Sequence, residues 1–342
     1  MQISVNSEAQ LKINPKTALK ISDVLAKYSG FSRMSLALKS DLSLCTVNRV
    51  VGHLTSVGIL SEKYNRSEGE AKICGHVYFG KRQILTVIDL SDYRFSVFRM
   101  NEQLDLLNRF EYSYNQSVSF YDNIEYFLRR AKHELWKNET QTDIPEYFII
   151  IDTMNGFPDG CSLLHNEGLK AYINQAVHEI FSVGFVKITS VESAMEYSDS
   201  TGLTCGYEPF RVNYICLREN PFMCCTEKSK SIFIGPISEK GGVEPNGRFS
   251  YSMKGAVLPE FLSELMGSVC RWLSPDMTVI DSDVYVIHSE LAQVIKRKLN
   301  LKFRYSSNVT VYPFKPMLYV RGAGLMLKRE IILNALTQPC RK

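Results

Sequence analysis

The stretch that decides the fold runs from Ser32 to Glu62 and reads SRMSLALKSDLSLCTVNRVVGHLTSVGILSE. Its second half carries apolar residues at helical spacing, namely Val47, Val50, Val51, Leu54 and Val57. Ser43 is a typical N-cap before this run, and Gly58 is a typical stop after it. The pattern predicts a helix with one buried face and one exposed face.

Two more helices and a hairpin are predicted around this helix. Asn14-Pro15 marks the start of a first helix, which Gly30 ends. Ser32 is placed to cap a short second helix, and Asp41-Leu42 makes the turn into the third. Residues 59–70 then read as a strand and a polar tip. This order is typical of a winged helix-turn-helix domain.

The excess positive charge of the chain is confined to the same region. Residues 1–72 hold ten Lys and Arg against six Asp and Glu, whereas the rest of the chain holds thirty of each. A basic segment on a neutral body indicates a polyanionic partner for that segment, although a solvated basic surface is the alternative. The exposed face of the third helix offers short polar groups and a guanidinium to base edges and phosphates. Its residues are Leu44, Cys45, Asn48, Arg49, Gly52 and His53.

Residues 32–62 resemble the N-terminal domain of ROK-family repressors, a group named for repressor, open reading frame and kinase. The usual form of that domain is close to S-R-x-x-L-A-x-x-x-x-L-S-x-x-T-V-x-x-x-V-x-x-L-x-x-x-G-L-x-x-E. The residues that match it in register include Ser32, Arg33, Leu36, Ala37, Ser43, Thr46, Val47, Gly58 and Glu62.

The resemblance implies that this segment binds DNA. Ser43 and Thr46, at the start of the third helix, are expected to meet phosphate or nearby base edges. Asn48 and Arg49 are expected to reach into the groove, and the wing is expected to contact the backbone or the minor groove. The predicted DNA contacts are Ser32, Arg33, Ser43, Leu44, Thr46, Asn48, Arg49, His53, Lys63 and Arg66.

After Tyr78 the sequence alternates strands with helices, which indicates an α/β class. The order resembles the two-lobed actin-like, or ribonuclease H-like, kinase domain of the same ROK family. The resemblance implies three parts. They are a winged helix-turn-helix domain at residues 1–78, an N-terminal lobe at residues 79–192 with 318–342, and a C-terminal lobe at residues 193–317.

Two kinase motifs that the resemblance implies are altered. The family phosphate loop reads D-x-G-G-T, whereas Asp89 is followed by Leu90-Ser91-Asp92-Tyr93, without the glycines whose amides approach phosphate. The family segment V-E-N-D-A supplies a general base, and Ala194 stands at its place. Such a base is typically worth about 10² to 10⁴ in rate. Glu192 or Glu196 is the alternative base.

The remaining nucleotide and metal motifs are missing as well. Residues 217–221 stand at the second phosphate loop and hold no glycine, and Asp281-Ser282-Asp283 replaces the adenine-side glycine pair. The family holds a structural zinc ion with one histidine and three cysteines. At those four positions stand Gly242, Ser250, Ser252 and Ala256. We therefore expect no metal, no cofactor and no enzyme activity.

Two residues are candidates for binding an effector. Asn155 lies in the stretch Asp152–Gly156, which follows a predicted buried strand and so falls at the carboxyl end of a sheet, where α/β folds bind ligands. A plain β-turn is the alternative for that stretch. Glu239 matches a position in the family that contacts a sugar hydroxyl. The resemblance implies a sugar-like effector between the lobes.

The sequence predicts a cytoplasmic protein without a membrane span. The longest apolar run, about Tyr147 to Ile151, is far shorter than the roughly 20 residues that cross a bilayer, and the first ten residues hold no apolar signal region. The nine cysteines form no C-x-x-C pair, which favours reduced thiols.

The leading hypothesis is a ROK-type transcriptional regulator, expected to be a repressor, whose kinase-like body no longer phosphorylates. Its partners would be palindromic double-stranded DNA and a sugar-like small molecule, and it would form a homodimer or a higher homo-oligomer. One alternative is an ATP-dependent sugar or amino-sugar kinase with an appended winged helix. Another is a scaffold whose winged helix binds protein.

Overall fold

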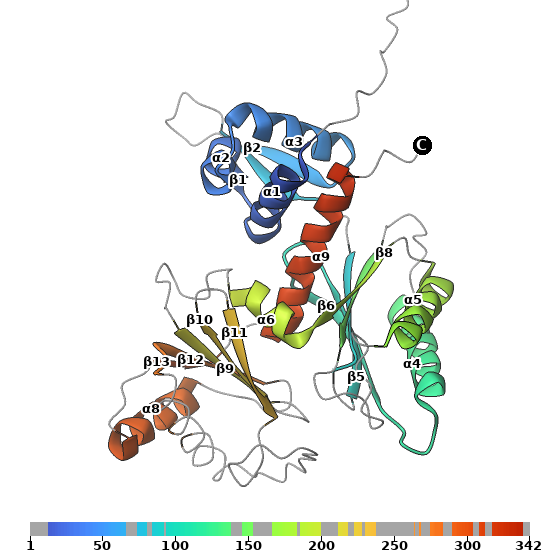
Figure 1. The fold of residues 1–342 in the computed structure, drawn as a ribbon, viewed down its shortest axis with the longest axis vertical. Coiled ribbons are helices and arrows are strands. Elements are labelled where there is room, and N and C mark those ends of the chain that lie inside the picture. The colour runs from blue at the N-terminus through green and yellow to red at the C-terminus, as the bar shows by residue number, and fades with distance from the viewer. Residues whose placement is uncertain are drawn as a thin grey trace, which may run out of the picture. The chain divides into compact units, whose positions relative to one another are not determined.

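The computed structural model describes most of the chain between residues 13 and 337 (Figure 1). The described residues are 13–65, 74–80, 84–91, 94–137, 146–152, 166–182, 185–199, 211–217, 222–227, 230–236, 263, 267, 274–282, 289–303, 308–311 and 317–337. The chain divides into two compact units. The N-terminal unit comprises Met1–Ile84 and Leu325–Lys342, and the body comprises Leu85–Gly324.

Three helices and a small sheet form the first part of the N-terminal unit. The helices are α1 (Pro15–Lys27), α2 (Arg33–Ser40) and α3 (Leu44–Ser56). The strands β1 (Phe31–Ser32), β2 (Leu60–Asn65) and β3 (Cys74–Phe79) make an antiparallel sheet in the order β1-β3-β2. The order of the three helices and of the strand after them is the one that the sequence predicts, whereas β1 and β3 were not predicted.

The helix starts are set by the capping residues predicted from the sequence. The side chains of Asn14, Ser32 and Ser43 accept hydrogen bonds from the backbone N–H groups of Lys16, Ser35 and Thr46. Asp41 ends α2 in the left-handed conformation, with φ at 52°, which turns the chain toward α3.

The buried side chains of the helices form one apolar core. They include Ala18, Ile21, Leu25, Leu36, Val47, Val50, Val51 and Leu54. The prediction that Val57 belongs to this core is wrong. Val57 is 44% exposed because α3 ends at Ser56 and Val57 is its C-cap.

The last part of the N-terminal unit is the end of a long helix, α9 (Leu318–Thr337). An Arg329 nitrogen lies 2.9 Å from a carboxylate oxygen of Asp23, and the Lys328 ammonium lies 5.2 Å from the ring centre of Phe79. Apolar side chains of this part of α9 are buried, among them Leu327, Ile331, Ile332 and Leu336. Residues 325–342, expected from the sequence to belong to a kinase-like lobe, thus group with the three helices. The other expected boundaries stay a prediction.

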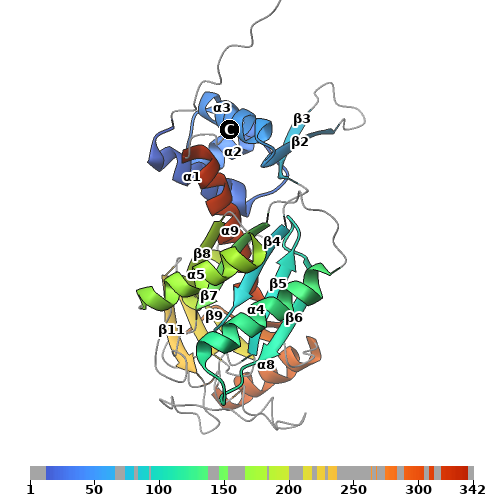
Figure 2. The ribbon, with the colours of Figure 1, turned by 90° about the vertical axis from the view of Figure 1, so that its right-hand side faces the viewer.

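The body holds two sheets of five strands. The first has the order β6-β5-β4-β7-β8. Its strands are β4 (Ile84–Asp89), β5 (Arg94–Met100), β6 (Leu106–Ser113), β7 (Glu146–Asp152) and β8 (Phe185–Ser190). Helices α4 (Phe120–Trp136) and α5 (Glu167–Phe181) lie along one face of it (Figure 2). Their apolar sides share a core with Phe95, Val97 and Phe148.

The second sheet repeats the strand order of the first. It runs β11-β10-β9-β12-β13, so each sheet has three antiparallel strands in a meander and then two parallel strands. The strands are β9 (Arg211–Leu217), β10 (Phe222–Glu227), β11 (Lys230–Pro236), β12 (Met277–Ser282) and β13 (Asn308–Val311). Helices α6 (Val191–Asp199) and α8 (Ser289–Phe303) and the beginning of α9 also belong to the body. The α/β class predicted for the body is confirmed.

Among the described residues, no helix is both long enough and apolar enough to cross a bilayer.

We expect Ile332→Ala to destabilise the N-terminal unit. Ile332 is fully buried in the part of α9 that belongs to this unit, and truncating such a side chain typically costs about 2–5 kcal/mol. Hydrogen exchange followed by mass spectrometry should show faster exchange in peptides of α1, α2 and α3. Thr337→Ala, at an exposed position of the same helix, is the control. Unchanged exchange in those peptides would mean that the end of α9 does not stabilise them.

Candidate nucleic-acid interface

Helix α3 presents a continuous exposed face that contains no acidic residue. The face consists of Leu44, Cys45, Asn48, Arg49 and Gly52. Its opposite side is the buried row of Val47, Val50, Val51 and Leu54, which orients the helix. Five of the six residues that the sequence placed on this face are exposed. The sixth, His53, is half-buried at its edge.

The first turn of α3 presents hydroxyl groups next to free backbone N–H groups. Ser43 is exposed, and its Oγ accepts a hydrogen bond from the Thr46 N–H at 3.2 Å. The two hydroxyl oxygens, Ser43 Oγ and Thr46 Oγ1, lie 2.9 Å apart. A helix N-terminus carries partial positive charge, so this end of α3 is favourable for an anion such as a phosphate.

Gly52, which has no side chain, lies in the middle of this face. A Cβ atom built at Gly52 would meet nothing within 4 Å, so the packing of the protein itself does not require a glycine. Glycine in a helix interior is less favourable than alanine by about 0.8–1.0 kcal/mol. Gly52 therefore lowers the stability of α3, and no packing contact within the chain requires it. A reason outside the chain would be the close approach of a partner.

Arg33 is bonded to two other elements of the N-terminal unit. Its Nε lies 2.6 Å from Glu62 Oε1 and its Nη2 lies 2.9 Å from Glu62 Oε2, a bidentate ion pair. Its Nη1 donates to Asn48 Oδ1 at 3.2 Å. Arg33 thus joins the start of α2 to strand β2 and to helix α3. The predicted DNA contact of Arg33 stays a prediction, and this guanidinium already serves the fold.

Glu62 was matched to the family pattern but given no role by sequence reasoning. The hydrogen bond from Arg33 lowers the pKa of the Glu62 carboxyl, and the hydrogen bond from Tyr64 adds to this effect. The same bond raises the pKa of Arg33. The family pattern over residues 32–62 was the signal in the sequence for this ion pair, because Arg33 and Glu62 stand near its two ends.

His53 has a partner on α9. Its Nε2 lies 3.1 Å from the carbonyl oxygen of Ala335, and because a carbonyl only accepts, this nitrogen carries the proton. Sequence reasoning missed Ala335, since 282 positions separate the two residues. The DNA contact predicted for His53 stays a prediction.

Of the two wing residues, one lies within the described residues. Lys63 is exposed on β2, and its ammonium lies 4.9 Å from the ring centre of Tyr78. Arg66 lies outside the described residues. Of the other predicted contacts, Leu44 is exposed and Ser32 is half-buried as the cap of α2.

In the body, the acid at the place of the family's phosphate loop is bonded to the protein's own groups. Asp89 is 3% exposed at the end of β4. Its Oδ1 accepts hydrogen bonds from the backbone N–H of Ser91, at 2.9 Å, and from the Ser91 hydroxyl. Its Oδ2 accepts one from the Tyr319 hydroxyl at 2.5 Å. The sequence contains no signal for the Tyr319 contact.

Two other altered kinase positions within the described residues, Ala194 and Asp281, are buried as well. Ala194 is fully buried in α6, and Asp281 accepts a hydrogen bond from the Leu318 N–H at 2.6 Å. The effector candidates Asn155 and Glu239 lie outside the described residues, as do the four positions at which the family holds zinc. Within the described part of the chain, no three His, Cys, Asp or Glu residues are grouped as metal ligands would be.

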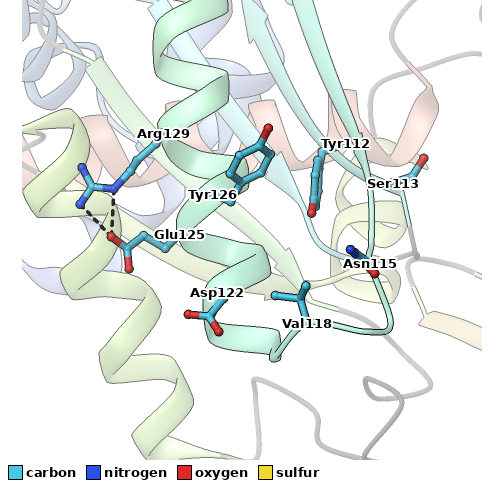
Figure 3. A pocket seen from close by; sticks show the side chains of 8 residues that line it. All are labelled: Tyr112, Ser113, Asn115, Val118, Asp122, Glu125, Tyr126 and Arg129. Atoms are coloured by element: carbon cyan, nitrogen blue, oxygen red, sulfur yellow. Dashed lines mark hydrogen bonds and ion pairs between the residues drawn. The ribbon is translucent and has the colours of Figure 1, made fainter.

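A hollow of about 710 Å³ lies between the end of β6 and α4 (Figure 3). Its lining consists of Tyr112, Ser113, Asn115, Val118, Asp122, Glu125, Tyr126 and Arg129. Its carboxylates already have partners, since Asp122 accepts from the Ser119 hydroxyl at 2.6 Å and Glu125 from Arg129 at 2.8 Å. Sequence reasoning did not find this hollow, and no group in it points to a particular ligand.

No protein-family model matches the sequence, and no curated protein does. Among solved structures, the chain is similar to one described as a ROK family transcriptional regulator, a homologue of the E. coli MLC protein. The similarity covers 94% of this chain and 98% of that one, with a TM-score of 0.61 and 9% sequence identity.

The chain has the fold of a ROK family transcriptional regulator. The resemblance to ROK-family regulators is thereby confirmed for the fold of the chain, whereas a helix-turn-helix in residues 32–62 stays a prediction. Two kinases of known structure are also similar over 72% of the chain. An inorganic polyphosphate/ATP-glucomannokinase from Arthrobacter sp. strain KM is 14% identical, with 98% of it covered and a TM-score of 0.47. A ROK hexokinase from Thermus thermophilus is 10% identical, with 99% of it covered and a TM-score of 0.42.

We expect Glu62→Gln to destabilise the ROK-like N-terminal unit in a pH-dependent way. The pKa of Glu62 is lowered in the folded state, so its ionised form contributes stability above the unfolded pKa, near 4.5. That contribution is lost as the pH falls through the folded pKa. Urea unfolding at pH 7 should therefore show the variant to be less stable than the parent, and the difference should shrink below about pH 4.5.

The matched control is Glu125→Gln, which removes an exposed carboxylate that pairs with Arg129 within α4. Exposed pairs of this kind contribute little, so the control should stay close to the parent. A difference between Glu62→Gln and the parent that persists unchanged at pH 3 would contradict the assigned ion pair.

Proposed function

We propose that the protein is a DNA-binding transcriptional regulator of the ROK type, a repressor that acts as a homodimer. The observation that carries the proposal is the exposed face of α3, with Arg49 and the opening at Gly52 and without any acidic side chain. In this reading α2 and α3 form a helix-turn-helix, and β2 with β3 forms the wing.

The charged and polar groups around this face fit a DNA duplex. Ser43 and Thr46 at the start of α3 would meet a phosphate, and Arg49 would reach a base edge or a second phosphate. Lys63 on β2 and Arg66 after it would meet the backbone beside the wing. Gly52 would let the helix lie close to the groove, because no side chain separates its backbone from the DNA.

Dimerisation is proposed because one such unit neutralises few phosphates. Two units that read half-sites about 34 Å apart would multiply affinity and require a palindromic operator. The body would supply the dimer interface and would act in the cytoplasm as the sensor of a small, sugar-like molecule. Asn155 and Glu239 remain the candidates for contact with that molecule.

The body is proposed to be catalytically inactive. Asp89 already accepts hydrogen bonds from Ser91 and Tyr319, so its oxygens are partly occupied and less able to hold a metal ion. The apolar Ala194 at the place of the family's general base cannot accept a proton. These two observations favour the regulator over the sugar kinase.

We expect Gly52→Ala to stabilise the fold and to weaken DNA binding. Alanine should raise the free energy of unfolding by up to about 1 kcal/mol, because it is the better helix former. Its methyl group should hold α3 away from the groove and weaken binding to a selected duplex by about tenfold or more. Urea unfolding and fluorescence anisotropy measure the two effects. A variant that binds as tightly as the parent would remove this face from the interface.

Arg49→Ala and Lys16→Ala serve as companions in the same assay. Arg49→Ala should cost about 1–3 kcal/mol of specific binding if the guanidinium reads a base. Lys16 is exposed on α1, so Lys16→Ala removes one positive charge at a position outside α3. If Lys16→Ala weakened binding as much as Arg49→Ala, the binding would reflect net charge alone.

We expect no phosphoryl transfer. With ATP and a panel of sugars and amino sugars, release of ADP should stay at the level of the Asp89→Asn variant, because neither variant nor parent has a general base at residue 194. A coupled ADP-release assay measures this. Turnover in the parent that Asp89→Asn abolishes would favour the kinase instead.

A further inference from the structure

The side chain of Asn48 is held in one orientation by Arg33. A guanidinium has five N–H donors and no acceptor, so an amide that bonds to it must present its oxygen. Arg33 Nη1 donates to Asn48 Oδ1 at 3.2 Å. The assignment of oxygen and nitrogen in this amide therefore follows from the chemistry of its partner.

Arg33 is itself held in place by Glu62. The two parallel hydrogen bonds at 2.6 and 2.9 Å fix the plane of the guanidinium, and Tyr64 donates a further bond to Glu62 Oε2 at 3.1 Å. The side chain of Glu62 is 11% exposed and that of Arg33 is 32% exposed, so both are partly shielded from water. The orientation of Asn48 on α3 is thus set by Arg33 on α2, which is held by Glu62 and Tyr64 on β2.

Arg33 occupies one of the two lone pairs of Asn48 Oδ1 and turns this oxygen toward itself, so Asn48 offers mainly its amino group to a partner. Asn48 lies on the exposed face of α3 beside Arg49. An asparagine that reads adenine in the usual bidentate way accepts from N6 and donates to N7, and so needs its oxygen as well as its nitrogen. A guanine presents two acceptors in the major groove, N7 and O6, and needs donors only.

We infer that Asn48, oriented by Arg33, is a specificity-determining residue that reads guanine rather than adenine in the operator. This inference rests on the proposed DNA-binding function. Asn48 would touch the base, while Arg33 and Glu62 are positioning residues that touch Asn48. Thymine, with the single acceptor O4, is the second-best base, and cytosine, whose N4 amino group only donates, is the worst.

The test starts with selection of bound duplexes from a random pool by the parent and by three variants. Asn48→Ala removes the amide. Asn48→Asp has nearly the same shape and keeps an oxygen for Arg33, but it replaces the amino group with an acceptor. Ser56→Ala, at an exposed position in the last turn of α3, is the control. Fluorescence anisotropy on duplexes that differ only at the sensitive position then measures the preference.

The expected result is one position per half-site at which the parent prefers guanine by about 5- to 150-fold. Asn48→Ala should lose the preference at that position alone. Asn48→Asp should change the base preference at this position toward cytosine, whose amino group can donate to a carboxylate. Ser56→Ala should enrich the same motif as the parent.

Three results would overturn the inference while the regulator stands. Adenine at the Asn48-sensitive position would mean that Arg33 does not hold the amide. Equal weakening of all sequences by Asn48→Ala would mean a phosphate contact. A relaxed preference at the same position in Ser56→Ala would mean a general effect on α3. If the parent enriches no motif, the proposed function fails and the inference fails with it.

Discussion

The bidentate ion pair between Arg33 and Glu62 fixes the relative positions of three elements in the N-terminal unit. It joins the first residue of α2 to strand β2, and the same guanidinium reaches α3 through Asn48. Side chains that read DNA must be held in place by neighbours that are themselves fixed. Under the proposed function, one partly shielded ion pair would provide this for α3 and β2 together, because its two hydrogen bonds define a plane as well as a distance.

The body combines two sheets of similar architecture with a buried acid, Asp89, that is bonded to the protein's own groups. Both sheets have the same strand order, and their cores consist of ordinary apolar side chains. Asp89 keeps its position at the end of β4, but its oxygens accept bonds from Ser91 and Tyr319. A buried carboxylate needs such donors whether or not a ligand is present. The bonds from Ser91 and Tyr319 therefore give Asp89 a structural role.

Local patterns allowed the elements of the N-terminal unit to be predicted almost completely. The caps at Asn14, Ser32 and Ser43 and the apolar row of α3 depend on neighbours within a few positions, so they can be read from the sequence. Val57 was misassigned because helical spacing does not show where a helix ends. In the candidate site, the exposed face of α3 followed from its buried face, but the partners of Arg33 and His53 did not.

By itself the sequence determined the order of the first three helices, the basic character of the first 72 residues and the differences from the kinase motifs, because each is a property of residues close together in the chain. Only the tertiary structure decided that Arg33 holds Asn48, that Tyr319 bonds to Asp89 and that the end of α9 belongs with the first three helices. These contacts join residues 15, 230 and about 300 positions apart. No local pattern specifies such pairs, since they form only after the apolar faces of separate elements have packed.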